Sequence, residues 1–283
     1  MSQSLFNVRE ALMKMKSYEQ AKGTKFVFRW RGGAVMNSFF TCHPVQHSFQ
    51  LFSVEHLVTL AIIVIMGAFI FLCRKQLRKK RFVFVLLSYV LIASETSYHA
   101  WEIGCHQWSV ETSLPLQLSD IVVLLAAVVL ITKSKFLFDF VYFAGISSSV
   151  QAMITPDLGG YAYAQFRYVQ FYVSHGGVVL ACCMLIAACR YEPAFRSLWV
   201  SVVFVNLYGG FIYVMNRLLG ANYLYMMKKP EHASLLDALG PHPWYLVSIE
   251  GIMILSFLVL YLPFWVHKKS KGDKSKVNFI EAE

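Results

Sequence analysis

The residues best suited to chemistry are a serine, an aspartate and a histidine that lie in two apolar stretches of the chain. Ser119 and Asp120 close the segment Leu114-Pro-Leu-Gln-Leu-Ser-Asp120, and His175 stands before two glycines. A hydroxyl beside an imidazole supplies a nucleophile and its general base, and a carboxylate can orient the imidazole. These residues predict a catalytic site with Ser119 as nucleophile, His175 as base and Asp120 as orienting group. The plainer alternative is a serine bonded to its own helix, which is common in membranes.

Further polar side chains lie near the same end of several apolar stretches. A charged group in hydrocarbon costs about 2.5 to 3.5 kcal/mol on insertion scales, so each of them is a candidate functional residue. Because they share one half of the membrane, they predict a polar cavity that opens to the outer side. The candidate substrate-binding residues are His56, Glu95, His99, Gln117, Asp157, Asn216 and Glu250. Gln117 or Asn216 would donate to an oxyanion, and Asp157 is an alternative partner for the catalytic histidine.

Two sets of these residues recur at helical spacing. Positions i, i+4, i+7 and i+11 share one face of an α-helix, so each set is expected to face the interior of a bundle. The sets are Glu95, His99 and Glu102, and Asn206, Gly210, Tyr213 and Arg217.

The elements that must position these residues are membrane helices. The chain has 283 residues, of which 57% are hydrophobic and 15% charged, whereas soluble domains carry about 25% charged residues. A helix that crosses a bilayer needs about 20 mostly apolar residues. The sequence therefore predicts an all-α, polytopic transmembrane bundle of about seven helices, over residues 53–73, 82–101, 114–132, 136–154, 168–189, 197–216 and 244–266.

The basic residues predict how this bundle is oriented. Lysine and arginine are concentrated in alternate connections and after the last stretch, at 74–81, 133–135, 190–196 and 268–276. The positive-inside rule then places the C-terminus in the cytoplasm and the N-terminus, counted from Met36, outside. The net charge of +10 is explained by these loops, and we expect no nucleic-acid partner.

The sequence predicts three regions. Residues 1–35 are basic and lack an apolar core, and we interpret them as an extension preceding a natural start at Met36. The alternative is a true cytoplasmic amphipathic extension. Residues 36–267 form the transmembrane domain, and residues 268–283 form a basic cytoplasmic tail.

The cysteines and the short motifs predict no cofactor. The six cysteines lack metal-ligand spacing, so no metal is expected, and no nucleotide, haem or flavin motif occurs. Cys42 and Cys105 both lie on the outer side and a disulfide is possible, but helix-end cysteines are more often small apolar residues, and we expect them to be unpaired.

Five segments, taken in order across about residues 49–265, resemble bacterial YwaF-like integral membrane proteins: residues 52–56, 114–120, 155–157, 174–177 and 234–245. This resemblance implies a helical membrane fold in a bacterial plasma membrane. Those proteins are distantly similar to an animal family of membrane phospholipid acyltransferases and to androgen-induced-gene-type hydrolases, which use a threonine and a histidine within the membrane. The resemblance implies acyl transfer or lipid-ester hydrolysis, with membrane lipids as partners and a lipid-like substrate.

The sequence departs from the acyltransferase pattern at the nucleophile. In that branch the nucleophile is a cysteine directly after a proline at a helix start, whereas here Pro115 is followed by Leu116 and Gln117. His175 matches the later histidine of the pattern, and Ser119, one turn beyond Leu116 on the same face, is the expected substitute. Two other functions are open: a proton-coupled transporter or lipid carrier using His99, His175 and Glu250, and a non-catalytic partner of another membrane protein.

Overall fold

The computed structural model describes residues 39–44, 49–230 and 235–280, so the predicted extension over residues 1–35 lies outside the described residues. All regular structure within these ranges is helical, as predicted. The long helices are α3 (Val54–Leu72), α5 (Arg81–Gly104), α6 (Leu118–Thr132), α9 (Phe166–Cys189), α10 (Phe195–Leu219) and α11 (Trp244–Ile280). The shorter ones are α4 (Arg74–Leu77), α7 (Lys135–Phe140), the π turn η1 (Val141–Gly145), α8 (Ile146–Ile154), η2 (Tyr223–Tyr225) and η3 (Leu235–Leu239).

Six helices or continuous helical segments are long and apolar enough to cross a membrane: α3, α5, the α7–η1–α8 segment, α9, α10 and α11. The remaining predicted span, α6, has 15 residues, which cover about 22 Å of the roughly 30 Å hydrocarbon thickness. It starts at Leu118 instead of the predicted Leu114, because residues 110–117 form a non-helical strap that bonds to a neighbouring loop. The chain is therefore a multi-pass membrane protein.

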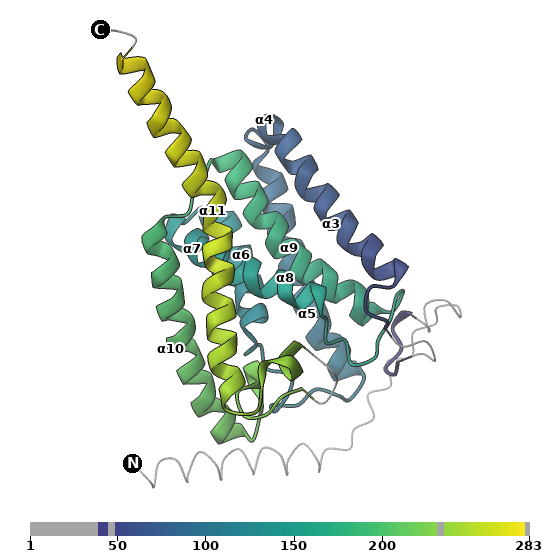
Figure 1. Ribbon diagram of the computed structural model, residues 1–283. Helices are drawn as coiled ribbons and strands as arrows, with labels where there is room; N and C mark the ends of the chain where they lie inside the picture. Colours follow the sequence, from purple (N-terminus) through teal and green to yellow (C-terminus); the bar gives the residue numbers. More distant parts are fainter. Residues whose placement is uncertain (1–38, 45–48, 231–234, 281–283) are drawn as a thin grey trace.

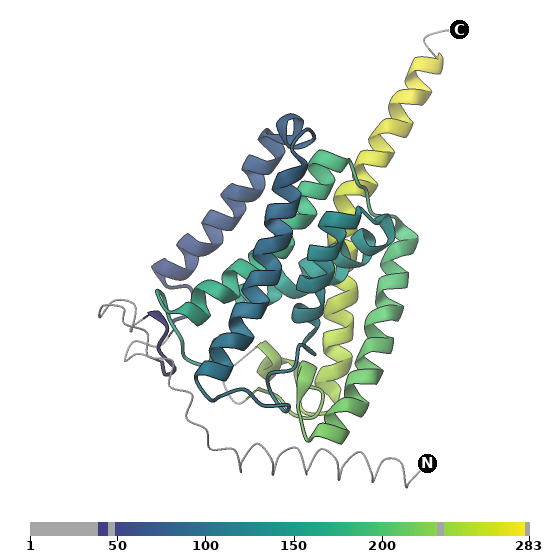
Figure 2. The same ribbon diagram turned by 180° about the vertical axis from the view of Figure 1, so that it is seen from behind.

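The connections between the helices gather at two ends of the bundle (Figure 1). We call one end the basic end: it holds residues 73–81, 133–134 and 190–194 and the end of α11. We call the other the polar end: it holds residues 105–117, 155–165, 220–230 and 235–243. The reverse view shows α11 extending past the other helices at the basic end (Figure 2).

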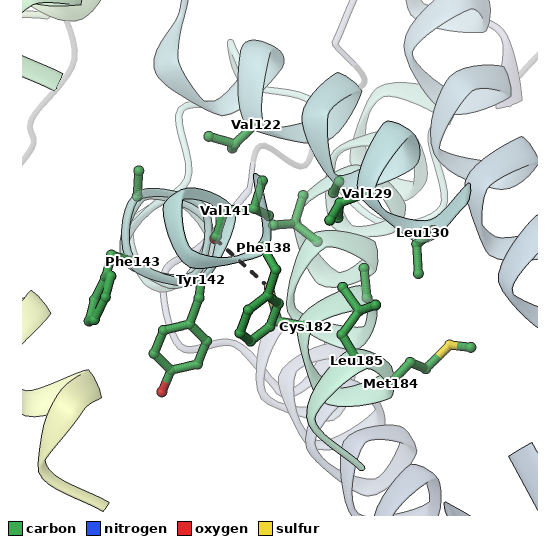
Figure 3. Packing of buried hydrophobic residues seen from close by; sticks show 14 of the residues in the cluster. Val122, Val129, Leu130, Phe138, Val141, Tyr142, Phe143, Cys182, Met184 and Leu185 are labelled. Atoms are coloured by element: carbon green, nitrogen blue, oxygen red, sulfur yellow. Dashed lines mark hydrogen bonds between the residues drawn. The ribbon is translucent and has the colours of Figure 1, made fainter. Parts of the chain in front are cut away.

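Helix α9 is the central element. Buried residues make up 78% of its most apolar segment, against 11% for α3 and 17% for α11. The C-terminal half of α9 packs on α6, α7 and the π turn. Side chains from these elements interdigitate there, among them Val122, Phe138, Val141, Cys182 and Leu185 (Figure 3). The Cys182 thiol lies 3.8 Å from the carbonyl oxygen of Val141, at the start of the π turn. This core fixes α9, which carries the predicted base His175.

Two glycines let neighbouring helices approach α9 closely. A Cβ atom at Gly176 would lie 2.8 Å from Ile63 Cδ1 on α3, and one at Gly177 would lie 2.5 Å from Leu91 Cδ2 on α5. Small residues at such crossings allow the backbones to pack in direct contact. The glycines after His175 therefore set the spacing of three helices.

The replacement Gly177→Val is expected to lower the free energy of unfolding by about 1 to 3 kcal/mol, because an overpacked core displaces its neighbours. Gly210→Val is the matched control, since a Cβ there meets no atom within 4 Å. The comparison is made from unfolding midpoints of the purified protein in detergent. Equal losses in both variants would contradict the close approach of α5.

The segment before α3 is covalently attached to the end of α5. Cys42 and Cys105 form a disulfide with a Cα–Cα distance of 5.3 Å, so the expectation that they are unpaired was wrong. Hydrogen bonds explain the approach: Gln107 Nε2 and the Tyr161 hydroxyl donate to the Cys42 carbonyl oxygen at 2.7 and 2.8 Å. Three contacts thus hold this segment on the polar end.

At the basic end, a lysine amine is buried against an aromatic ring. Lys133 follows α6 with a positive φ of 55°, and its Nζ lies 3.1 Å from the centroid of the Phe84 ring. No hydrogen-bond partner reaches this Nζ within the described residues. Burial lowers the pKa of Lys133 to about 8 from 10.5.

The lowered pKa predicts a dependence of stability on pH. Between about pH 8 and 10.5 the unfolded chain binds more protons at Lys133 than the folded chain, so the free energy of unfolding rises with pH there. Lys133→Met should flatten this rise, and Lys75→Met, at an exposed position, should not. Unfolding midpoints measured from pH 8 to 10.5 would refute the assignment if all three proteins gave one slope.

Candidate functional site

A group of polar side chains surrounds the guanidinium of Arg167, and we call it the polar cluster: Arg167, Glu95, His99, Glu102 and Asp120. The Arg167 Cζ atom is 4.4 Å from the centroid of the Tyr98 ring and 5.3 Å from that of Phe171. Its Nη1 donates to Gln170 Oε1 at 2.7 Å. Arg167 lies in the first turn of α9. Its side chain points toward Tyr98 on α5.

Three carboxyl groups from two other helices lie within electrostatic range of this guanidinium and of one another: Glu95, Glu102 and Asp120. Glu95 and Glu102 are 7% and 8% exposed. The Tyr98 hydroxyl donates to Glu102 Oε1 at 2.7 Å, while Oε2 has no partner in the described part of the chain. The carboxyl groups outnumber the guanidinium, so the cluster holds more oxygen acceptors than cations.

His99 extends this cluster along α5. Its Nε2 lies 3.5 Å from Glu95 Oε1, and its Nδ1 is buried without a partner among the described residues. The spacing of Glu95, His99 and Glu102 predicted one inward face, and the structure confirms that these three side chains lie together.

Asp120 caps α6 and holds Ser119. Its Oδ2 accepts from the backbone N–H of Gln117 at 3.3 Å, and its Oδ1 accepts from the Ser119 hydroxyl at 3.3 Å. Ser119 has no hydrogen bond to His175 within the described residues. The predicted nucleophile is thus paired with the predicted orienting carboxylate and not with the base.

His175 is held in one tautomer. Its Nδ1 lies 2.8 Å from the carbonyl oxygen of Phe171, and the ring stacks on that of Phe171 at 4.1 Å. A carbonyl can only accept, so Nδ1 carries the proton and the neutral ring presents the lone pair of Nε2. Arg167 interacts electrostatically with this imidazole, which joins His175 to the cluster.

A buried hydroxyl and amide network fastens α5 to α9 beside these groups. The Ser94 and Ser174 hydroxyls are 2.7 Å apart, and Gln170 Nε2 donates to Ser174 Oγ at 3.1 Å. Arg167, Gln170 and Ser174 share one face of α9 at i, i+3 and i+7. This spacing was the available signal for Arg167, whose central role the sequence analysis missed.

The loop after α10 closes the polar end over the strap. The Asn216 side chain pairs with the backbone N–H and carbonyl of Tyr223, both at 2.8 Å. The Tyr223 hydroxyl accepts from Leu114 N–H at 2.9 Å, and Gln117 Oε1 accepts from Leu224 N–H at 3.0 Å. Asn216 is therefore engaged in positioning, whereas the Nε2 group of Gln117 has no hydrogen-bond partner among the described residues.

Asp157 lies at the rim of this end. Its Oδ2 accepts from the Tyr225 hydroxyl at 2.8 Å, and its Oδ1 lies 3.4 Å from the Gly159 N–H. Burial, reinforced by the Asp157 carboxylate, raises the pKa of Tyr225. The contact joins the loop after α8 to the loop after α10.

Two predicted site residues lie in other contacts. His56 is fully buried between α3 and α8: Nδ1 accepts from Phe52 N–H at 3.0 Å, and Nε2 donates to the Met153 carbonyl at 2.8 Å. Glu250 on α11 accepts from Asn206 Nδ2 on α10 at 2.9 Å. Both residues fasten pairs of helices.

The predicted inward face of α10 was wrong for most of its length. Tyr213 is 47% exposed, and Asn206, Gly210 and Arg217 are also exposed. This face points away from the other helices because α10 stands at the edge of the bundle (Figure 1). Its one buried polar residue at this end is Asn216, which serves the loop.

These helices define the chain as a polytopic membrane protein. The profile of the TMEM164 family matches residues 51–261. The chain belongs to the TMEM164 family. No curated protein and no solved structure matches it, and the resemblance to YwaF-like proteins stays a prediction.

Removing the central cation should destabilise the bundle. Arg167→Gln is expected to cost about 1 to 3 kcal/mol, because it removes the hydrogen bond to Gln170 and the cation nearest the carboxyl groups. Glu102→Gln in the same chain should recover part of this loss by removing one negative charge. Arg217→Gln, at an exposed site on α10, should change stability by about 0.5 kcal/mol or less.

These variants are compared by their unfolding midpoints in one detergent at one pH. A double variant that is no more stable than Arg167→Gln alone would show that charge balance does not hold the cluster together.

Proposed function

We propose that the polar end catalyses acyl transfer between membrane lipids or hydrolysis of a lipid ester. The observation that carries the proposal is the His175 tautomer, in which the Phe171 carbonyl holds Nδ1–H at 2.8 Å and leaves Nε2 as a base. A base fixed inside a water-poor protein site is the element that both reactions share. Membership in a family of multi-pass membrane proteins agrees with a lipid substrate.

We assign the roles from the chemistry of these side chains, and Ser119 must exchange its bond to Asp120 for one to His175. Nε2 of His175 takes the proton of the nucleophilic hydroxyl, which we assign to Ser119. The Ser119 oxygen then forms a bond to the ester carbonyl carbon, and Gln117 Nε2 donates to the oxygen that becomes negative. The bond to the leaving alkoxide breaks, and this alkoxide takes the proton from His175.

The second half of the reaction repeats these steps in reverse. The hydroxyl of a lysolipid, or a water molecule, gives its proton to His175 and attacks the acyl-serine. The ester to Ser119 breaks, and the serine oxygen recovers the proton. Asn216 acts as a positioning residue, since its amide already holds Tyr223.

The charge of the cluster favours one class of headgroup. Three carboxyl groups lie near one guanidinium, so the cluster offers a headgroup more oxygen acceptors than cations. A zwitterionic lipid can place its ammonium near Glu102, whose Oε2 has no partner among the described residues. The Trp101 ring, whose centroid lies 6.2 Å from that of Tyr98, would add cation–π attraction.

The test is turnover by the purified protein in detergent with a zwitterionic lysophospholipid and a diacyl donor. His175→Asn and Ser119→Ala are each expected to reduce transfer and hydrolysis by at least about 100-fold, the range lost with a general base or nucleophile. His267→Asn and Ser256→Ala, at an exposed and a half-buried position of α11, are the matched controls. Full activity of His175→Asn would refute the base, and full activity of Ser119→Ala would refute the covalent step.

Proton-linked transport is a second candidate because Glu95 and His99 are 3.5 Å apart and His99 Nδ1 has no partner in the described residues. Such a pair can pass a proton across part of the membrane. In proteoliposomes, a pH gradient should then drive uptake of a zwitterionic lipid analogue, and Glu95→Gln should abolish it. Uptake that is unchanged by a proton uncoupler would exclude this function.

A further inference from the structure

Two adjoining hollows lie on the surface of α10 near the basic end. The larger, of about 450 Å³, lies between α10 and α7, and the smaller measures about 300 Å³. Both are lined by Arg196, Val200 and Phe204. These three residues form one ridge at i, i+4 and i+8 along the helix, so the hollows flank a shared ridge.

The larger hollow has mostly apolar walls, and its serine and aspartate side chains are hydrogen-bonded within the protein. Its apolar lining includes Leu125 and Phe140. The polar lining atoms are already satisfied by the protein: Ser201 Oγ donates to the Ser197 carbonyl at 2.8 Å, and Ser197 Oγ donates to Asp139 Oδ2 at 2.6 Å. Lys135 pairs with the other oxygen of Asp139. A hydrocarbon chain in this hollow would therefore leave none of these hydroxyl or carboxylate groups without a hydrogen-bond partner.

The smaller hollow has the same character. Trp199 and Val203 complete its lining, and they are 45% and 57% exposed. The indole lies in the second turn of α10, next to the end of the span, where tryptophan favours the membrane interface.

The shared end of the two hollows carries an unneutralised positive charge. Arg196 is exposed in the first turn of α10 and makes no ion pair among the described residues. The Asp139 carboxylate nearby is neutralised by Lys135, so it does not cancel this charge. The backbone N–H groups of the first turn add to the positive potential.

We propose that this ridge binds one anionic phospholipid of the leaflet at the basic end, with its phosphate on Arg196 and its two acyl chains on either side of Val200 and Phe204. Two apolar hollows that meet at one cation match two hydrocarbon chains that meet at one phosphate. This lipid site lies at the end of the bundle opposite the proposed catalytic site and does not depend on it.

The experiment is native mass spectrometry of the full chain after incubation with phosphatidylglycerol or phosphatidylcholine of identical acyl chains. Phosphatidylglycerol adducts should exceed phosphatidylcholine adducts by about fivefold, the effect of one interfacial arginine. Arg196→Gln should bring phosphatidylglycerol down to the phosphatidylcholine level. Arg217→Gln, at the other end of the same helix, should retain the preference.

A second variant tests the hollows separately from the charge. Ser201→Trp fills the larger hollow and should reduce the adducts of both lipids while Arg196 is intact. Unfolding midpoints without added lipid verify that each variant is folded, and Val203→Trp, which fills the smaller hollow, replaces Ser201→Trp should that variant unfold.

Three results would overturn the proposal. The first is equal retention of the two lipids by the unchanged protein, and the second is full phosphatidylglycerol preference in Arg196→Gln. The third is a dimer that replaces the lipid adducts and is lost in Ser201→Trp, which would make a second copy of this chain the occupant of the ridge.

Discussion

The attraction between one guanidinium and three carboxyl groups is the constraint on which the polar end depends. Arg167 comes from α9, Glu95 and Glu102 from α5, and Asp120 from α6, so the cluster can exist only when these three helices are assembled. Burial makes each charge costly alone and makes their mutual interaction strong. The Ser94–Ser174 contact and the close approach at Gly177 hold α5 and α9 at the separation that the charges require.

The short α6 imposes a second requirement on the same region. A 15-residue helix cannot cross the hydrocarbon layer, so part of the strap before it lies at membrane depth, where non-helical backbone must be satisfied by the protein. Tyr223 and Tyr208 meet this need by bonding the strap backbone at 2.9 to 3.0 Å. Gln117 Oε1 in turn accepts from the backbone of the neighbouring loop. Asn216 and Gln117 both resemble oxyanion donors in the sequence, yet both bond to backbone groups here. The Asn216 amide uses its nitrogen and its oxygen on Tyr223, whereas Gln117 uses only its oxygen, and this difference separates their proposed roles.

Hydropathy was sufficient to predict the helical membrane fold and six of the crossings, because the bilayer demands long apolar runs whatever the packing. Helical spacing was also sufficient for Glu95, His99 and Glu102, whose face is buried. The same rule failed at Asn206 and Tyr213, since periodicity reports that residues share a face and not which neighbour covers it. Arg167 was missed for a related reason: its partners come from distant segments, and the Cys42–Cys105 disulfide likewise depends on a fold-back that no local pattern encodes.

The length of α11 has a consequence for the membrane around the protein. Its 37 residues extend about 55 Å, roughly 25 Å more than the hydrocarbon thickness, and the excess projects at the basic end (Figures 1 and 2). Lys268 and Lys269 lie within 6.0 Å of the aromatic rings of Tyr261 and Trp265 at the base of this projection. Lys268 and Lys269 add positive charge where this helix leaves the bundle, and positive charge at a membrane surface attracts acidic lipids.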